Sequence, residues 1–127
     1  MTTSRGLAIG MFGLAAWFLV SWPVGLLLAP DRLQRPAELG YLLGDVVVLL
    51  PLAVASAIGL LRGRRWASGL SLVVLGGLAY DVVHFGVRSA QEQEAVLVRL
   101  AIAAGIVLFL AGLAWVVRRV LVEITAR

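Results

Sequence analysis

Long apolar runs are the feature that most limits what this chain can fold into. Examples are VVVLLPLAVASAIGLL at residues 46–61 and LVRLAIAAGIVLFLAGLAWVV at residues 97–117. A helix needs roughly 20 mostly apolar residues to cross about 30 Å of hydrocarbon. The runs do not alternate between apolar and polar residues, as the strands of a membrane barrel would. The sequence therefore predicts an all-α integral membrane protein.

Four segments have the required length, near residues 7–29, 41–61, 66–87 and 96–117. Only 14% of the 127 residues are charged, and the mean hydropathy is +1.01, whereas soluble domains carry about 25% charged residues. The first segment is too long for a secretory signal and ends in a poor cleavage sequence, so we expect it to remain as a span. The prediction is a single transmembrane domain over residues 1–127, folded as an antiparallel four-helix bundle.

Arginine residues gather at one set of span ends. The connection between the second and third spans reads RGRR, a pair of arginines follows the fourth span, and Arg5 precedes the first. Because basic residues concentrate on the cytoplasmic side, both termini are expected in the cytoplasm, at a plasma or inner membrane. Trp66 and Trp115 beside these arginines, with Trp22 and Tyr41 near the other ends, are expected as interfacial anchors.

Composition excludes several classes of function. The net charge of +4 is explained by the arginines at the span ends, so no nucleic-acid partner is expected. The absence of Cys excludes disulfides, thiolate metal sites and a cysteine nucleophile. The sequence has no Gly-rich phosphate loop, Walker motif or zinc-protease helix.

Polar residues interrupt the third span in the stretch YDVVHFGVR, residues 80–88. At about 100° per residue, Asp81, His84 and Arg88 lie within roughly 60° of one another on the helix. A charge in a membrane costs about 2.5–3.5 kcal/mol on insertion scales and usually faces the bundle interior. The predicted topology brings residues of neighbouring spans to the same depth. The expected outer-leaflet polar cluster consists of Asp45, Tyr80, Asp81, His84, Arg88 and Arg99.

This cluster allows three kinds of chemistry. The Asp81–His84 pair could carry protons, since His changes charge near neutral pH. Binding of a divalent cation is the second possibility, but a D-x-x-H pattern supplies only two ligands at helical spacing, so no metal site is expected. Haem held between two axial His ligands would need a second His, so no cofactor is expected. His84 could also serve as a general base, but Ser68 and Ser71 lie toward the other half of the span, so an enzyme is not favoured.

Several local patterns predict how the helices end, bend and pack. Small residues four apart mark possible helix contacts at Gly6/Gly10, Gly40/Gly44, Ala55/Gly59 and Ala101/Gly105. Pro23 and Pro51 are expected to kink the first and second spans. Ser89 and Glu92 have the spacing of a capping box, which predicts that the last helix begins near residue 90.

The favoured function is an accessory or scaffold subunit of a membrane assembly, because a small bundle without large loops has few other surfaces with which to act. The alternative is an oligomeric proton- or cation-coupled transporter or channel that uses the polar cluster. A third possibility is a membrane-embedded enzyme acting at the level of the lipid headgroups. The expected partners are the lipid bilayer and either further copies of the chain or a larger membrane complex.

Overall fold

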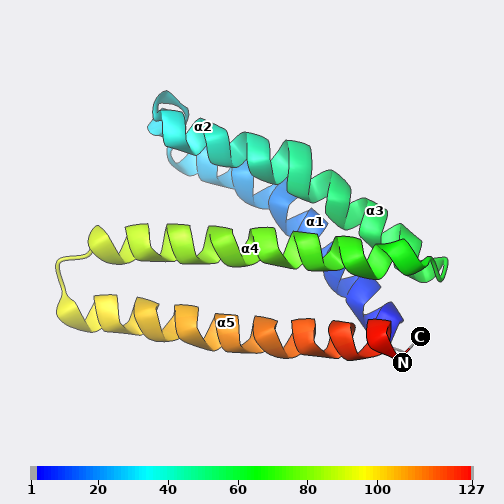
Figure 1. The fold of residues 1–127 in the computed structure, drawn as a ribbon. Helices are drawn as coiled ribbons and strands as arrows, with labels where there is room; N and C mark the ends of the chain where they lie inside the picture. Colours follow the sequence, from blue (N-terminus) through cyan, green and yellow to red (C-terminus); the bar gives the residue numbers. More distant parts are fainter. Residues whose placement is uncertain (1–2, 127) are drawn as a thin grey trace. The chain divides into compact units, whose positions relative to one another are not determined.

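The structure, a computed structural model, describes residues 3–126, and within this range every regular element is helical (Figure 1). The elements are α1 (Thr3–Leu28), the 3₁₀ helix η1 (Pro30–Gln34), α2 (Pro36–Leu43), the π-helical segment η2 (Gly44–Leu49), α3 (Leu50–Leu61), α4 (Arg65–Gln91) and α5 (Val96–Thr125). Four helical segments are long and apolar enough to cross a membrane: Ser4–Leu28, Glu38–Leu61, Arg65–Gln91 and Val96–Thr125. The predicted all-α class and its four membrane-length helices are confirmed.

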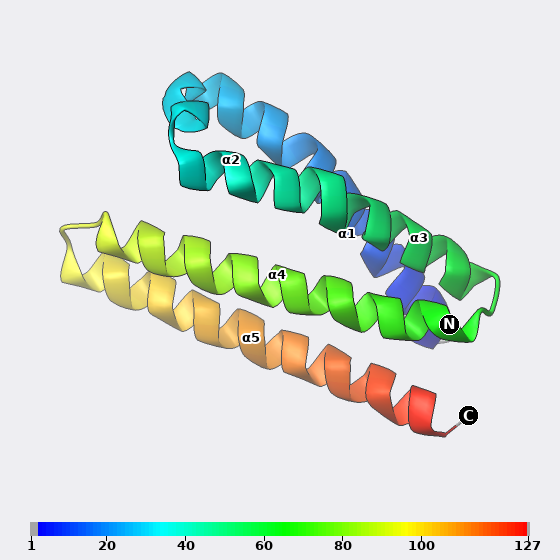
Figure 2. The same cartoon turned by 45° about the horizontal axis from the view of Figure 1, so that its top comes forward.

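The helix ends differ from the sequence-based boundaries in several places, since α1 begins at Thr3 instead of near residue 7 and α5 continues to Thr125 instead of ending near residue 117. α2, η2 and α3 follow one another directly and form one long helix (Figure 2), which begins at Pro36 because proline suits the first helical turn. The predicted capping box is wrong: Ser89 lies inside α4, and α5 begins after Ala95, which provides no side-chain cap. Glu92 instead approaches Arg88, with 3.4 Å between Oε1 and Nε. Such an i,i+4 pair favours extension of the preceding helix.

The chain divides into two compact units, Met1–Val74 and Leu75–Arg127, and α4 contributes to both. In the first unit, α1 packs along α3. The buried side chains of α1 recur alternately three and four residues apart, which places them on one face of the helix. These residues are Ala8, Met11, Ala15, Phe18 and Trp22. Ala53 and Ala57 are fully buried on α3, and such small side chains allow two helix backbones to approach closely.

A tight turn joins α3 to α4 within the first unit. Gly63 has a φ of +65°, a left-handed conformation that favours glycine. Its N–H donates to Leu60 O at 3.1 Å, and the N–H of Arg64 donates to Gly59 O at 2.8 Å. These two bonds form a Schellman motif, which satisfies the last carbonyls of α3 and reverses the chain within a few residues. The RGRR sequence is thereby held at the end of a helical hairpin.

The second unit is also a helical hairpin, formed by residues 75–91 of α4 and by α5, which run antiparallel (Figures 1 and 2). Gly86 of α4 lies directly against Ile106 of α5, where a Cβ on residue 86 would collide with the Ile106 side chain. Val120 is the single buried side chain of α5 among the described residues. Most of the surface of α5 is therefore exposed in the isolated chain.

Glycine at position 59 is required by the packing of α3 on the start of α4. A Cβ built on Gly59 would lie 2.7 Å from Ala67 Cβ and 2.8 Å from the Trp66 ring. We expect Gly59→Ala to lower the free energy of unfolding by about 1–3 kcal/mol through overpacking, measured by SDS titration in mixed micelles with circular dichroism.

Gly10→Ala is the matched control, because nothing lies within 4 Å of a Cβ at that position. It should leave stability unchanged or raise it by up to about 1 kcal/mol through helix propensity. Equal effects of the two substitutions would contradict the close contact at Gly59.

Candidate functional site

A buried hydrogen bond between Trp22 and Asp45 links α1 to η2 in the first unit. Trp22 Nε1 donates to Asp45 Oδ2 at 2.7 Å, and the two residues are only 4% and 5% exposed. The indole N–H is a donor only, and a carboxylate accepts, so the pair is chemically matched. The expectation that Trp22 is an interfacial anchor is wrong, because its ring is buried against the neighbouring helix.

The backbone around Asp45 has an unusual local form. In η2 the hydrogen bonds span five residues, and the N–H of Leu50 donates to the carbonyl of Asp45. Pro51, which has no N–H to donate, follows immediately. A π-helical turn takes one more residue than an α-helical turn and often occurs at functional positions. In this protein the π-helical turn lies just before Pro51, whose missing N–H would otherwise interrupt the hydrogen bonds of a regular α-helix.

Pro23 lies inside α1, and the helix continues through it to Leu28. Sequence analysis expects kinks at both prolines. The structure thus shows a π-helical segment before Pro51 and an uninterrupted helix at Pro23. The predicted kinks at the two prolines stay predictions.

Glu38 is a second buried acid in the first unit and was not among the predicted site residues. It is 3% exposed and lies in the first turn of α2, seven residues before Asp45. Two residues seven apart fall on nearly the same face of a helix. Pro36 is the sequence signal that could have identified Glu38, because it starts the helix five residues before the predicted span and so brings Glu38 into the helix.

Three serine side chains are buried where α3 meets the beginning of α4: Ser56, Ser68 and Ser71. The hydroxyl oxygens of Ser56 and Ser71 lie 2.5 Å apart. They also lie 3.1 Å and 2.8 Å, respectively, from the carbonyl oxygen of Ala67. Hydroxyls that bond across two helices in this way contribute to helix association in apolar surroundings. Ser56 received no role from the sequence.

In the second unit, α4 carries the polar stretch predicted from the sequence. Asp81 is buried, and His84 is half-buried. The Tyr80 ring stacks on the imidazole of His84, with 6.1 Å between centroids and 17° between planes. The Phe85 ring meets the same imidazole edge-on at 6.0 Å. Two aromatic rings therefore contact the imidazole of His84, Tyr80 by stacking and Phe85 by its edge.

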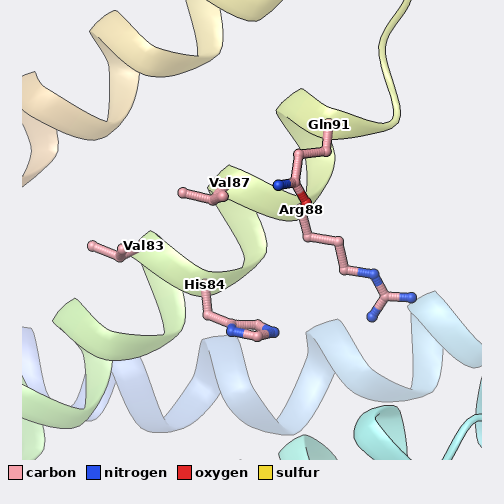
Figure 3. Close-up of a pocket in the computed structure, with 5 residues that line it drawn as sticks. All are labelled: Val83, His84, Val87, Arg88 and Gln91. Carbon is pink, nitrogen blue, oxygen red and sulfur yellow. The ribbon is translucent and has the colours of Figure 1, made fainter.

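His84 and Arg88 also line an open cavity of about 370 Å³ with Val83, Val87 and Gln91. Figure 3 shows the side chains of His84 and Arg88 on one side of α4 and those of Val83 and Val87 pointing away from them. The Arg88 side chain is 28% exposed and approaches Glu92. This cavity thus combines an imidazole, a guanidinium and an amide with an apolar wall.

Arg99 lies in the first turn of α5, and its Nε donates to the backbone oxygen of Gln93 at 2.5 Å. Asp45 belongs to the first unit, whereas Tyr80, Asp81, His84, Arg88 and Arg99 belong to the second. The meeting of all six residues in one cluster stays a prediction. Across residues 3–126, no three acidic or histidine side chains gather as a metal-binding group.

The Trp22–Asp45 bond should contribute to stability. We expect Trp22→Phe, which keeps an aromatic ring but removes the donor, to lower the free energy of unfolding by about 1–2 kcal/mol. Trp17→Phe on the same helix is the matched control, because Trp17 is 65% exposed and should change stability by less than about 0.5 kcal/mol. Both would be measured by SDS titration.

A double-mutant cycle isolates this hydrogen bond from packing changes. In an Asp45→Ala background, Trp22→Phe should cost clearly less than it does in the parent. The same cost in both backgrounds would mean that the indole N–H contributes nothing through Asp45.

Comparison of the chain with family models, with curated proteins and with solved structures finds no match. Its function is therefore inferred from its own residues.

Proposed function

We propose that this chain is an accessory or scaffold subunit of a membrane assembly. The observation that carries the proposal is the exposure of α5: none of its 18-residue apolar window is buried, whereas the other three membrane-length helices bury 22–33% of theirs. In a bilayer an apolar helix surface is covered by lipid or by another helix. α5 therefore has an apolar surface that lipid or a partner helix would cover.

One face of α5 has the composition that favours contact with another helix. At about 100° per residue, Ala101, Gly105, Leu108 and Gly112 lie within about 60° of one another, on a face about 100–160° around the helix from Ile106. All four are exposed, and open space surrounds a Cβ built on either glycine. Small residues allow close backbone approach between membrane helices. The proposed partner is a further copy of the chain or a helix of a larger complex.

The buried polar contacts of the first unit support a structural role for its polar side chains. The Trp22–Asp45 bond joins α1 to η2, and the hydroxyls of Ser56 and Ser71 join α3 to α4. Each contact links two helices and satisfies groups that would be costly to bury alone. A scaffold benefits from such fixed helix positions.

The proposal includes four antiparallel spans in a single domain, with both termini in the cytoplasm of a plasma or inner membrane. The arginines at the α3–α4 turn, Arg118 and Arg119 in the last turns of α5, and Arg5 in the first turn of α1 support this orientation through the positive-inside bias. The ends of α4 and α5 around residues 88–99 would then face the opposite side.

A second candidate, coupled transport of protons or cations, is favoured by one observation. Asp81 is a buried carboxylate within an apolar membrane-length helix, one turn from His84. An ionisable residue at such a position is often part of an ion pathway. The following experiment separates the two candidates.

The purified chain, reconstituted in vesicles loaded with a pH-sensitive dye, should show no proton flux above that of protein-free vesicles. Asp81→Asn and His84→Ala should change the yield of folded protein without affecting flux. In a mild detergent, protein extracted from its native membrane should have a larger mass by light scattering than the 13.5 kDa monomer.

Flux that disappears in Asp81→Asn at unchanged yield would overturn the scaffold proposal and support transport. A monomer that carries no flux would contradict both candidates.

The orientation can be tested by labelling single cysteines introduced at Gly63 and Gln91, since the chain has no natural Cys. A membrane-impermeant maleimide should label position 91 in intact cells and position 63 only after the membrane is opened. Labelling of both positions from the same side would overturn the proposed topology.

A further inference from the structure

A groove between α4 and α5 lies next to their connecting loop. Val87, Ala90 and Gln91 line it from α4, and Arg99, Ala103 and Ile106 line it from α5. Its volume is about 210 Å³. Four of the six lining residues are apolar, and the polar two, Gln91 and Arg99, lie nearest the loop. The groove therefore has an apolar floor and a polar rim.

The packing of the two helices explains why the groove exists. The helices touch where the Ile106 side chain occupies the space that a Cβ at Gly86 would need. One turn closer to the loop, Ala90 and Ala103 carry only methyl groups, so the space between the helices is not filled. The loop 92–95 then joins the helix ends. The groove thus lies on the loop side of the contact between Gly86 and Ile106.

Arg99 is held at the rim by the loop itself. Its Nε donates to the carbonyl oxygen of Gln93, and this bond uses one of the five N–H donors of a guanidinium. The N-terminus of α5 lies at the same rim, and its N-cap residue Ala95 supplies no side-chain acceptor. The positive end of the helix dipole therefore adds to the charge of Arg99.

We propose that this groove binds a phospholipid, with its phosphate at Arg99 and the start of one acyl chain along Val87, Ala103 and Ile106. The ends of membrane-length helices lie at the level of the lipid headgroups, so a phosphate is available there. Guanidinium and phosphate form strong, bidentate hydrogen bonds. The layout of the groove, charged at the rim and apolar below, matches that of the lipid.

An apolar partner helix suits the groove less well than a lipid does. It would exclude water from the guanidinium without supplying a counterion, which is unfavourable. The lipid site also lies on the opposite side of α5 from the partner face defined by Ala101, Gly105, Leu108 and Gly112. The lipid proposal can therefore fail while the scaffold proposal stands, and the reverse is equally possible.

Native mass spectrometry of the full chain in detergent tests the site directly. With added phosphatidylglycerol we expect a one-to-one lipid adduct, and with diacylglycerol, which lacks the phosphate, no comparable adduct. Arg99→Gln should weaken phosphatidylglycerol binding roughly tenfold, the loss expected for a charge-assisted hydrogen bond. Arg118→Gln, at an exposed arginine near the other end of α5, is the matched control and should bind as the parent does.

A second variant tests the apolar floor while Arg99 is kept. Ala103→Phe should fill the groove and also weaken binding, with helicity by circular dichroism confirming that each variant folds. Equal binding by parent and Arg99→Gln, or equal binding of diacylglycerol, would overturn the proposal. Displacement of the lipid by millimolar inorganic phosphate would show a site for the free anion and would overturn it as well.

Discussion

A helix that crosses a bilayer has to satisfy its own backbone, because the hydrocarbon core offers no water to bond with the amides and carbonyls. The four membrane-length helices meet this requirement almost throughout. The exceptions are the two prolines within these helices: Pro23 removes one donor inside α1, and in the long second segment Pro51 removes one donor and the preceding turn takes the π-helical form of η2. The position of Asp45, and with it the bond to Trp22, depends on how that turn is arranged.

Polar side chains in this protein have two kinds of role. In the first unit they are buried and form hydrogen bonds between helices, as in the pairs Trp22–Asp45 and Ser56–Ser71. In the second unit His84 and Arg88 line an open cavity on α4, and Arg99 lines the groove between α4 and α5. The first arrangement supports a stable scaffold, and the second offers sites for a ligand from the surrounding membrane.

The sequence predicts the helical class well, because length and apolar composition alone determine which segments can span a bilayer. It predicts the partners of individual side chains less well. Trp22 has the composition and position of an interfacial anchor, and only the placement of α1 beside η2 shows that its N–H meets Asp45. Glu38 was missed because the helix begins at Pro36, and Ser56 because serine is common in membrane helices. The false capping box at Ser89 arose because Glu92 also has Arg88 one turn away.

The extra residue held in η2 has a consequence for how the chain can vary. Because a π-helical turn takes one more residue than an α-helical turn, deleting one residue between positions 44 and 49 would be absorbed by a change of this segment to an ordinary α-helix. The residues before it would then keep their face relative to α3. The same deletion inside the regular α-helix of α3 would instead rotate the preceding residues by about 100°. Among sequences that share this architecture, a one-residue gap should thus be tolerated better within η2 than within α3.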